Sequence, residues 1–240
     1  KESHPRLKLS KRLSQIEALI GHDYTHIWDT CCDHGFLGTH LIEQQRAAHV
    51  HLVDIVPELI SPLDDKLKAL FSNPHGSKWQ THCLDVSKLP LQQYEGKHLV
   101  IIAGIGGDLM IQCLKKLLTN HPTAEIDFIL CPIRQLYSLR QQLIAFDMRL
   151  KQEVLVKENN QYYEILFVSS QKGSHPKEPP LSCINPVGRE IWQAENEEQT
   201  KIVEEYREIT LQHYKRMLRG TNNLALNEII QAYQATNVCK

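Results

Sequence analysis

The sequence lacks the long apolar run of a membrane protein and the charge excess of a typical nucleic-acid-binding protein. No stretch approaches the roughly 18 uninterrupted apolar residues that a membrane span needs, so we expect no membrane partner. Residues 1–10 are polar and carry no signal-peptide core, which predicts a cytoplasmic protein. The net charge of −1 at pH 7 counts only mildly against a nucleic-acid partner, because the distribution of charge matters more than its sum.

The seven cysteines and thirteen histidines contain none of the common metal-binding spacings. There is no Cys-x-x-Cys pair, and the adjacent Cys31 and Cys32 suit neither a disulfide nor a metal clamp, so we expect reduced thiols. The histidines are scattered and lack the i, i+4 pattern of a zinc-binding helix. We therefore expect no metal site.

Basic residues gather near both ends of the chain. Lys11 and Arg12 belong to the first group, and Lys215, Arg216 and Arg219 form the second. Each group is either an RNA-binding surface or a solvated helix face.

Short apolar runs alternate with longer amphipathic stretches. A first helix is predicted between Ser10, which can cap it, and Gly21, which can end it. The alternation then predicts strands over 26–29, 50–54, 78–83, 99–103 and 126–130, and helices over 35–45, 57–71, 107–118 and 135–146. Such alternation indicates a parallel sheet with helices on both faces, which binds ligands beyond the carboxyl ends of its strands.

The end of this pattern is more specific. Two β-rich runs, 150–156 and 162–168, are joined by five residues, which leaves no room for a helix and predicts an antiparallel hairpin. A dinucleotide dehydrogenase would continue with another crossover. A mostly parallel α/β sheet whose last strand is antiparallel resembles the Rossmann-like sheet of class I methyltransferases.

The C-terminal part has a different composition. We expect a first domain over 1–170, a linker rich in Pro, Gly, Ser and Lys over 171–187, and a helical hairpin over 188–240. The apolar stripes predicted for the hairpin are Ile202, Tyr206, Ile209, His213 and Met217, then Leu226, Ile229, Ile230 and Tyr233. Because the first stripe is sparse, we expect the hairpin to be held by docking or by substrate, as a packing appendage or an RNA-gripping arm.

Acidic residues follow three of the predicted strands. Asp29 and Asp33 flank the loop after the first strand, where carboxylates suit an ammonium group and would repel a pyrophosphate. Asp54 ends the second strand and can accept both ribose hydroxyls of a nucleoside. Asp85 follows the third and can accept from an adenine amino group. The alternatives are turn and helix-cap roles for Asp29 and Asp33, and an ordinary loop role for Asp85.

Glycines follow the fourth strand, in the segment Ala103-Gly104-Ile105-Gly106-Gly107. They allow close approach to a ligand or a positive φ, and we interpret the segment as the floor beneath a transferred methyl group. A dinucleotide fingerprint would need its third glycine at Leu109. A structural tight turn is the alternative.

Four segments together resemble one family: residues 9–13, Asp29 to His34 with Leu37, 103–107, and Tyr163-Glu164-Ile165. They are similar to the bacterial tRNA (adenine-22-N1)-methyltransferases, which combine a class I methyltransferase domain with a C-terminal coiled-coil hairpin. The resemblance covers roughly residues 9 to 168 and implies S-adenosyl-L-methionine as cofactor and tRNA as substrate. Carried onto this chain, it implies a cofactor pocket lined by Asp29, Asp33, His34, Asp54, Asp85 and Gly104. We expect Cys31, Ile55, Ala103 and Gly106, in the same loops, to bind the cofactor as well.

Three positions depart from the family pattern. The family's glycine in the first loop is Cys31, the usual Gly-Pro is missing near Glu58 and Leu59, and the family's asparagine after the fifth strand is Ile133, which cannot hydrogen-bond a base. These changes affect the substrate more than the fold.

Methyl transfer to N1 of adenine needs no general base, because the neutral ring already presents a lone pair. We expect positioning to supply much of the acceleration, with Asp33 stabilising the positive charge on adenine and His34 orienting Asp33. The alternatives are a methyltransferase for a small molecule or protein, and a non-catalytic RNA-binding protein with a degenerate cofactor pocket.

Overall fold

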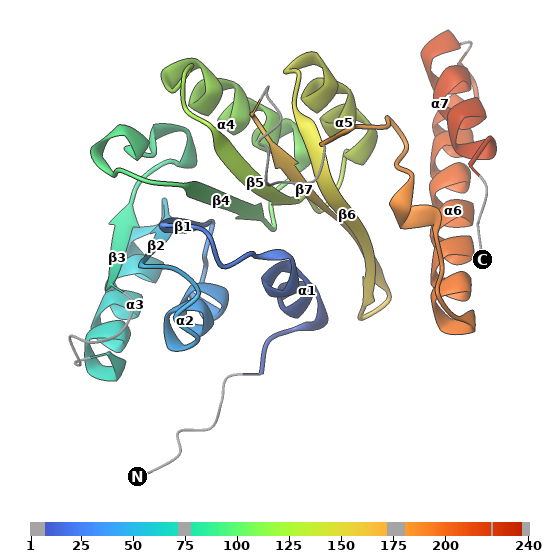
Figure 1. Ribbon diagram of the computed structural model, residues 1–240. Helices are drawn as coiled ribbons and strands as arrows, with labels where there is room; N and C mark the ends of the chain where they lie inside the picture. Colours follow the sequence, from blue (N-terminus) through green and yellow to red (C-terminus); the bar gives the residue numbers. More distant parts are fainter. Residues whose placement is uncertain (1–7, 72–77, 172–180, 222, 237–240) are drawn as a thin grey trace.

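The computed structural model describes residues 8–71, 78–171, 181–221 and 223–236. Its centre is one eight-stranded sheet with the order β3-β2-β1-β4-β5-β7-β6-β8 (Figure 1). The strands are β1 His26–Thr30, β2 His49–Asp54, β3 Lys78–Cys83, β4 His98–Ala103, β5 Ile126–Cys131, β6 Arg149–Glu158, β7 Gln161–Ser169 and β8 Ser182–Cys183. Strands β1 to β5 are mutually parallel, and β7 joins β5 antiparallel. The predicted fold class, a parallel sheet closed by an antiparallel hairpin, is confirmed.

Helices cover both faces of the sheet (Figure 1). One face carries α1 Lys11–Leu19, α2 Phe36–Glu43 and α3 Pro57–Leu70, and the other carries α4 Gly107–Asn120 and α5 Leu136–Ala145. Because successive strand residues point to opposite faces, Ile101 belongs to the first core and Val100 and Ile102 to the second. Short 3-10 turns lie at Val86–Lys88 (η1), Leu91–Gln93 (η2) and Glu190–Trp192 (η3).

The N-terminal helix α1 begins where the sequence predicts. The Ser10 side chain caps it by accepting from the Leu13 N–H at 3.2 Å. Ile16 and Leu19 are buried in the core that α1 shares with α2 and with the β6–β7 hairpin. The helix therefore fixes its first residues beside that hairpin.

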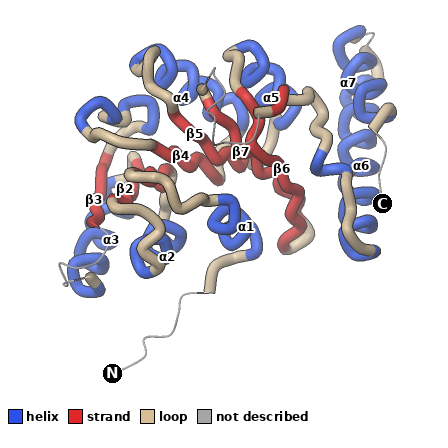
Figure 2. Tube along the Cα trace, in the orientation of Figure 1, coloured by secondary structure: helices blue, strands red, loops and turns tan. Residues whose placement is uncertain are grey.

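The C-terminal helices α6 Glu197–Leu218 and α7 Leu224–Gln234 stand beside β6 (Figure 2). The first predicted stripe is confirmed at Ile202 and Tyr206, which pack against the buried cluster. It was wrong at Ile209, His213 and Met217, which are exposed, whereas Val203 and Leu211 are buried. The choice of face is set by contacts with the sheet domain, which a stripe counted within one helix does not contain. The second stripe is confirmed in its last members, Ile230 and Tyr233.

The two helices share a core with the sheet domain. Leu155 of β6 is buried together with Trp192, Val203 and Tyr233. The preceding segment is also packed, since Ser182 and Cys183 form β8 against the start of β6, and Ile184 and Val187 are buried. Much of the predicted linker 171–187 is therefore part of the packed structure, and residues 172–180 lie outside the described residues. Within the described ranges, no helix is long and apolar enough to cross a membrane.

A buried charge network joins these parts. Arg140 of α5 is fully buried, and its guanidinium contacts Glu164 of β7 at 2.7 Å and Glu153 of β6 at 2.7 Å. The second oxygen of Glu164 accepts from the Tyr206 hydroxyl of α6 at 2.6 Å, and Arg140 also donates to the Asn185 carbonyl. Paired and hydrogen-bonded in this way, the three charges tolerate burial, and they fix α6 onto the sheet.

Candidate active site

The residues predicted to bind a cofactor converge on one edge of the sheet. Strands β2, β1 and β4 lie side by side and end at the same level, since Thr30 pairs with Val53 on one side and with Ile102 on the other. The loops that follow these strands therefore meet. We call this side of the sheet the carboxyl edge and the opposite side the amino edge.

Asp29 is buried beneath the first loop. Its carboxylate accepts from the Gly38 N–H at 2.8 Å, in the first turn of α2. Burial raises the pKa of Asp29 to about 7, and nearby Asp54 adds to the rise, while the Gly38 hydrogen bond opposes it. This contact is the helix-cap role that we considered as the alternative. The Asp29 carboxylate is therefore engaged with α2 and is almost fully buried.

Asp54 holds the first loop in place at the end of β2. One carboxylate oxygen accepts from the Asp33 N–H and the other from the Val56 N–H, each at 3.1 Å. The residue is 8 % exposed. Because an ionised carboxylate has about four acceptor positions, each oxygen of Asp54 keeps a free lone pair.

The first loop has an unusual backbone. Cys31, Asp33 and Gly35 all have positive φ, at 54°, 51° and 68°. Only glycine adopts this region without strain, so two of the three positions are strained. This agrees with the sequence comparison at Cys31, where the similar family has glycine. Burial raises the pKa of the Cys31 thiol to about 12, so it stays protonated at neutral pH.

The predicted catalytic pair is exposed at this loop. The Nε2 atom of His34 lies 3.5 Å from the Asp33 carboxylate, and both side chains are about two-thirds exposed. Neither side chain is committed to the core, so both are free to meet a ligand.

The remaining predicted cofactor residues on this side differ in availability. Ile55 is 64 % exposed, an apolar side chain open to solvent directly after β2. Asp85 caps η1, since one of its oxygens accepts from the Ser87 N–H at 2.8 Å, and this hydrogen bond lowers the pKa of Asp85. One oxygen of Asp85 thus has the loop role that we considered as the alternative.

The glycines after β4 serve different purposes. Gly104 has φ of 83°, and a Cβ built there would meet nothing within 4 Å, so its backbone borders open space beside the half-buried Ala103. A Cβ on Gly106 would lie 3.0 Å from Nε of Arg134, and one on Gly107 would lie 2.7 Å from the Gln135 carbonyl oxygen. Gly104 therefore faces a possible ligand, whereas Gly106 makes room for a neighbouring loop.

The predicted RNA-binding residues do not form one patch. Lys11 is exposed beside the β6–β7 turn, where its backbone N–H donates to Glu158, and Arg12 lies over the Tyr163 ring. Lys215, Arg216 and Arg219 are exposed at the far end of α6, about 27 Å along the helix from Glu198. Figure 1 shows α6 running away from the β6–β7 turn toward that end.

Sequence reasoning missed a chain of histidines inside the second core. His26 and His51 share a hydrogen bond of 3.0 Å between ring nitrogens, as do His51 and His82. Trp28 stacks on His51 with 3.7 Å between ring centroids. The signal was the alternation His26-x-Trp28 and His49-x-His51 within strands, which places every second residue on one face. Among the described residues, no group of three side chains could hold a metal ion.

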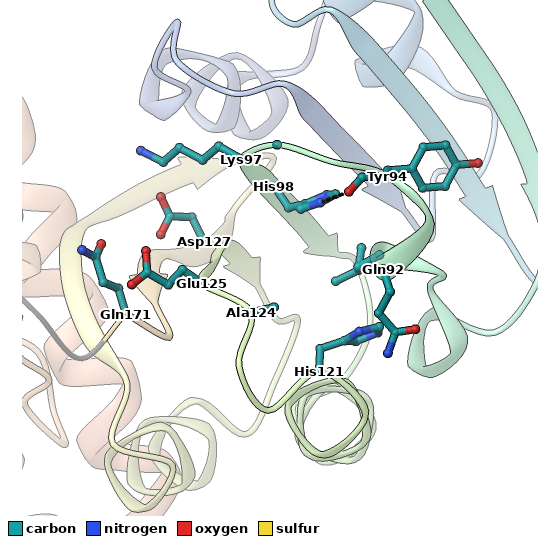
Figure 3. A pocket seen from close by; sticks show the side chains of 11 residues that line it. Gln92, Tyr94, Lys97, His98, His121, Ala124, Glu125, Asp127 and Gln171 are labelled. Carbon is teal, nitrogen blue, oxygen red and sulfur yellow. Dashed lines mark hydrogen bonds between the residues drawn. The ribbon is translucent and has the colours of Figure 1, made fainter.

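A cavity of about 570 Å³ lies at the amino edge, away from the predicted site (Figure 3). Its lining includes Asp127 and His121. The Asp127 carboxylate is occupied, because it accepts from the Tyr24 hydroxyl at 2.5 Å and contacts the Lys151 ammonium at 2.8 Å. These pairs stabilise the amino ends of the strands, so we do not assign the cavity to the reaction.

Comparison with known proteins identifies the family of the chain. The family model for a methyltransferase domain matches residues 9–166. The structure of TrmK from M. capricolum in complex with S-adenosyl-homocysteine is similar at 19% identity and a TM-score of 0.71, covering 94% of this chain and 96% of that chain. The B. subtilis m1A22 tRNA methyltransferase TrmK is similar at 18% identity and a TM-score of 0.63, covering 95% of each chain.

A methyltransferase acting on a small molecule is similar over a smaller part. Magnesium protoporphyrin IX methyltransferase from Synechocystis PCC 6803, solved with bound S-adenosylmethionine, matches at 14% identity and a TM-score of 0.50, covering 66% of this chain and 78% of that chain. No curated protein sequence matches the chain. At such identities the solved structures establish the fold, and the family model, which matches more than half of the chain, establishes the family.

Proposed function

The chain belongs to the methyltransferase domain family, and we propose that it uses S-adenosyl-L-methionine to methylate N1 of an adenine in tRNA. The observation that supports tRNA as the substrate is the share of the chain over which the similarity extends. The TrmK structures match about 95% of the chain, which includes α6 and α7, whereas the small-molecule enzyme covers 66%. We propose accordingly that residues 1–170 form the catalytic domain and 188–240 a helical unit that assists RNA binding.

The residues at the carboxyl edge fit this cofactor. Gly104 leaves open space at the end of β4, and Asp54 keeps one free lone pair on each oxygen for ribose hydroxyls. The exposed Ile55 suits the apolar face of adenine, and the free oxygen of Asp85 suits its amino group. We assign Asp29, Cys31 and Ala103, which are buried or half-buried at the ends of β1 and β4, to the remaining wall of the cofactor pocket. When bound, the cofactor supplies a methyl group on a positively charged sulfur.

We assign Asp33 as the electrostatic catalyst. Adenine gains positive charge as its N1 is methylated, and a carboxylate near the ring stabilises that charge. The Asp33 backbone has a positive φ of 51°, and the Nε2 atom of His34 lies 3.5 Å from its carboxylate, where it can orient it. No residue has to remove a proton before transfer, so the main tasks of the chain are orientation and electrostatics.

The basic residues divide into two RNA contacts. Lys11 and Arg12 lie beside the β6–β7 turn at the carboxyl edge, and we assign them to phosphates close to the target nucleotide. Lys215, Arg216 and Arg219 would bind a more distant part of the RNA, because α6 carries them about 27 Å further along. A folded RNA such as tRNA spans this separation.

The test is transfer of a tritiated methyl group into total bacterial tRNA, followed by nucleoside analysis. We expect 1-methyladenosine as the labelled product, and loss of cofactor binding in Asp54→Ala measured by calorimetry. Label in a small molecule or a protein instead would favour the first alternative. Cofactor binding without transfer to any acceptor would favour a non-catalytic RNA-binding protein.

A further inference from the structure

We propose that Arg134 holds a phosphate of the target nucleotide while Ile133 and Leu109 contact its base. The inference rests on the proposed tRNA methylation and gives a role to Arg134, which the sequence did not indicate. It concerns the loops 104–108 and 132–135, which we call the double loop. These loops follow β4 and β5 and therefore lie at the carboxyl edge, beside the open space at Gly104.

Backbone hydrogen bonds join the two halves of the double loop. The Ile133 N–H donates to the Ile105 carbonyl at 3.0 Å, and the Gly107 N–H donates to the Arg134 carbonyl at 3.1 Å. The peptide group that follows the Arg134 Cα is thus held directly, and the chain is held again one residue before Arg134. The position of Arg134 is set by the sheet rather than by a free loop.

The residue after Arg134, Gln135, has a strained backbone conformation. Gln135 has φ of 64°, in the left-handed region, although it is not glycine. Its side-chain oxygen accepts from the Asp108 N–H at 3.1 Å, and its amide donates to the Asp108 carboxylate. A strained residue held by reciprocal hydrogen bonds is typical of functional loops.

The Arg134 side chain crosses Gly106. A Cβ on Gly106 would lie 3.0 Å from Nε of Arg134, which is closer than ordinary packing permits. The second glycine of the segment 103–107 therefore gives the guanidinium its path, two residues after Gly104. The carboxylates of Asp54 and Asp85 follow β2 and β3, which β1 separates from β4 and β5.

Charge and polarity at this place fit a nucleotide. The salt bridges of the described residues give Arg134 no acidic partner, so its guanidinium is available for bidentate contact with a phosphate. Ile133 is 50% exposed and Leu109 is 52% exposed. A base taken out of its stack needs apolar surface, and Ile133 of the double loop and Leu109 in the first turn of α4 offer it.

The experiment compares Arg134→Gln, Arg134→Lys and Gly106→Ala with the wild-type protein in methyl transfer to tRNA. We expect Arg134→Gln to lower kcat/KM for tRNA at least 10-fold, and the log–log salt slope of tRNA binding to fall by about 1. Arg134→Lys keeps the charge but cannot make a bidentate contact, so its kcat/KM for tRNA should lie between those of the wild-type protein and Arg134→Gln. Gly106→Ala should displace Arg134 and resemble Arg134→Gln in direction. The affinity for S-adenosyl-L-methionine should stay within twofold in the Arg134 variants.

Arg149→Gln is the matched control, because it removes the same charge at the amino edge, where Arg149 contacts Asp147. A kcat/KM for tRNA within twofold of wild type in Arg134→Gln would overturn the inference and leave the proposed function intact. Wild-type protein that binds cofactor but methylates no RNA would overturn the proposed function, and the inference with it.

Discussion

The guanidinium carbon of Arg12 lies 4.8 Å from the centroid of the Tyr163 ring. This contact joins α1 to β7, two segments about 150 positions apart in the chain that both carry part of the family resemblance. Leu130 pairs with Leu166 near the carboxyl end of β5, so Tyr163, three residues before Leu166 in β7, lies at the carboxyl edge of the sheet. The cation therefore stands at the edge where RNA is proposed to bind.

This placement gives the first prediction. Replacing Lys11 and Arg12 together by glutamine should lower the magnitude of the log–log salt slope of tRNA binding by about 2, because two phosphate contacts are lost. The measurement is the affinity for tRNA at salt concentrations between about 50 and 200 mM, over which such slopes are determined. Arg149→Gln, at the amino edge, should leave the slope unchanged. Weak wild-type binding that does not respond to salt would contradict the RNA assignment altogether.

The second prediction concerns backbone strain at Cys31, whose φ is 54°. Cys31→Gly removes the strain of a side chain in the left-handed region, and Cys31→Ala keeps it while removing the thiol. We expect the glycine variant to unfold with a free energy about 1 kcal/mol higher than the alanine variant. Urea denaturation of the two variants measures the difference. Equal stabilities would mean that the loop relaxes around a side chain at this position.

Much of the sheet could be predicted from the sequence, because each strand is a short apolar run between helical patterns. The face that α6 buries could not, since the contacts that select it come from Leu155, far away in the chain. The sequence also predicted which acidic residues lie at the site, but it did not predict the groups that they contact. The Asp29 carboxylate meets Gly38, and only the fold brings that N–H to it. Arg134 gave no signal, because a single arginine after a strand has no spacing to interpret.

The third prediction follows from the histidine chain of His26, His51 and His82. If His26 donates through Nε2 to the Glu95 carbonyl, its Nδ1 must accept from His51, and His51 must in turn accept from His82. Each ring is then neutral, with one proton. Burial lowers the pKa of His51 to about 2 and also lowers the pKa of His26 and His82, with neighbouring histidines contributing at His51 and His26.

The direction of the pH effect follows from these lowered values. The unfolded histidines take up protons below about pH 6.5, whereas the folded ones do not, so stability is complete above pH 6.5 and is lost as the pH falls below it. At pH 5.5, His51 alone should cost about 1.4 kcal/mol of unfolding free energy. Urea denaturation at pH 7.5 and pH 5.5 measures the loss, and His51→Gln should reduce it. A stability that does not change between these pH values would show that the histidines are not held neutral.

The fourth prediction concerns the contact between α6 and the sheet. Tyr206→Phe removes the hydrogen bond to the buried Glu164 and should lower the unfolding free energy by about 1–3 kcal/mol. Tyr162→Phe is the matched control, because it removes a similar bond to Glu205, whose carboxylate is exposed. We expect a much smaller change in the control, because solvent screens the Glu205 carboxylate. Equal effects in chemical denaturation would contradict the role that burial gives to the Tyr206 contact.

The last prediction decides how the C-terminal helices are held. A chain ending at Ser170 loses Tyr206 and the Asn185 carbonyl from the network around Arg140, and it uncovers Leu155. Opening a buried charge network costs about 3–5 kcal/mol, so the melting temperature should fall by roughly 6–20 °C. A chain ending at Gly220 keeps the network and loses only α7, and it should melt between the two. A soluble protein ending at Ser170 that melts with the full chain would instead make the helices a separate arm, held by RNA rather than by the sheet.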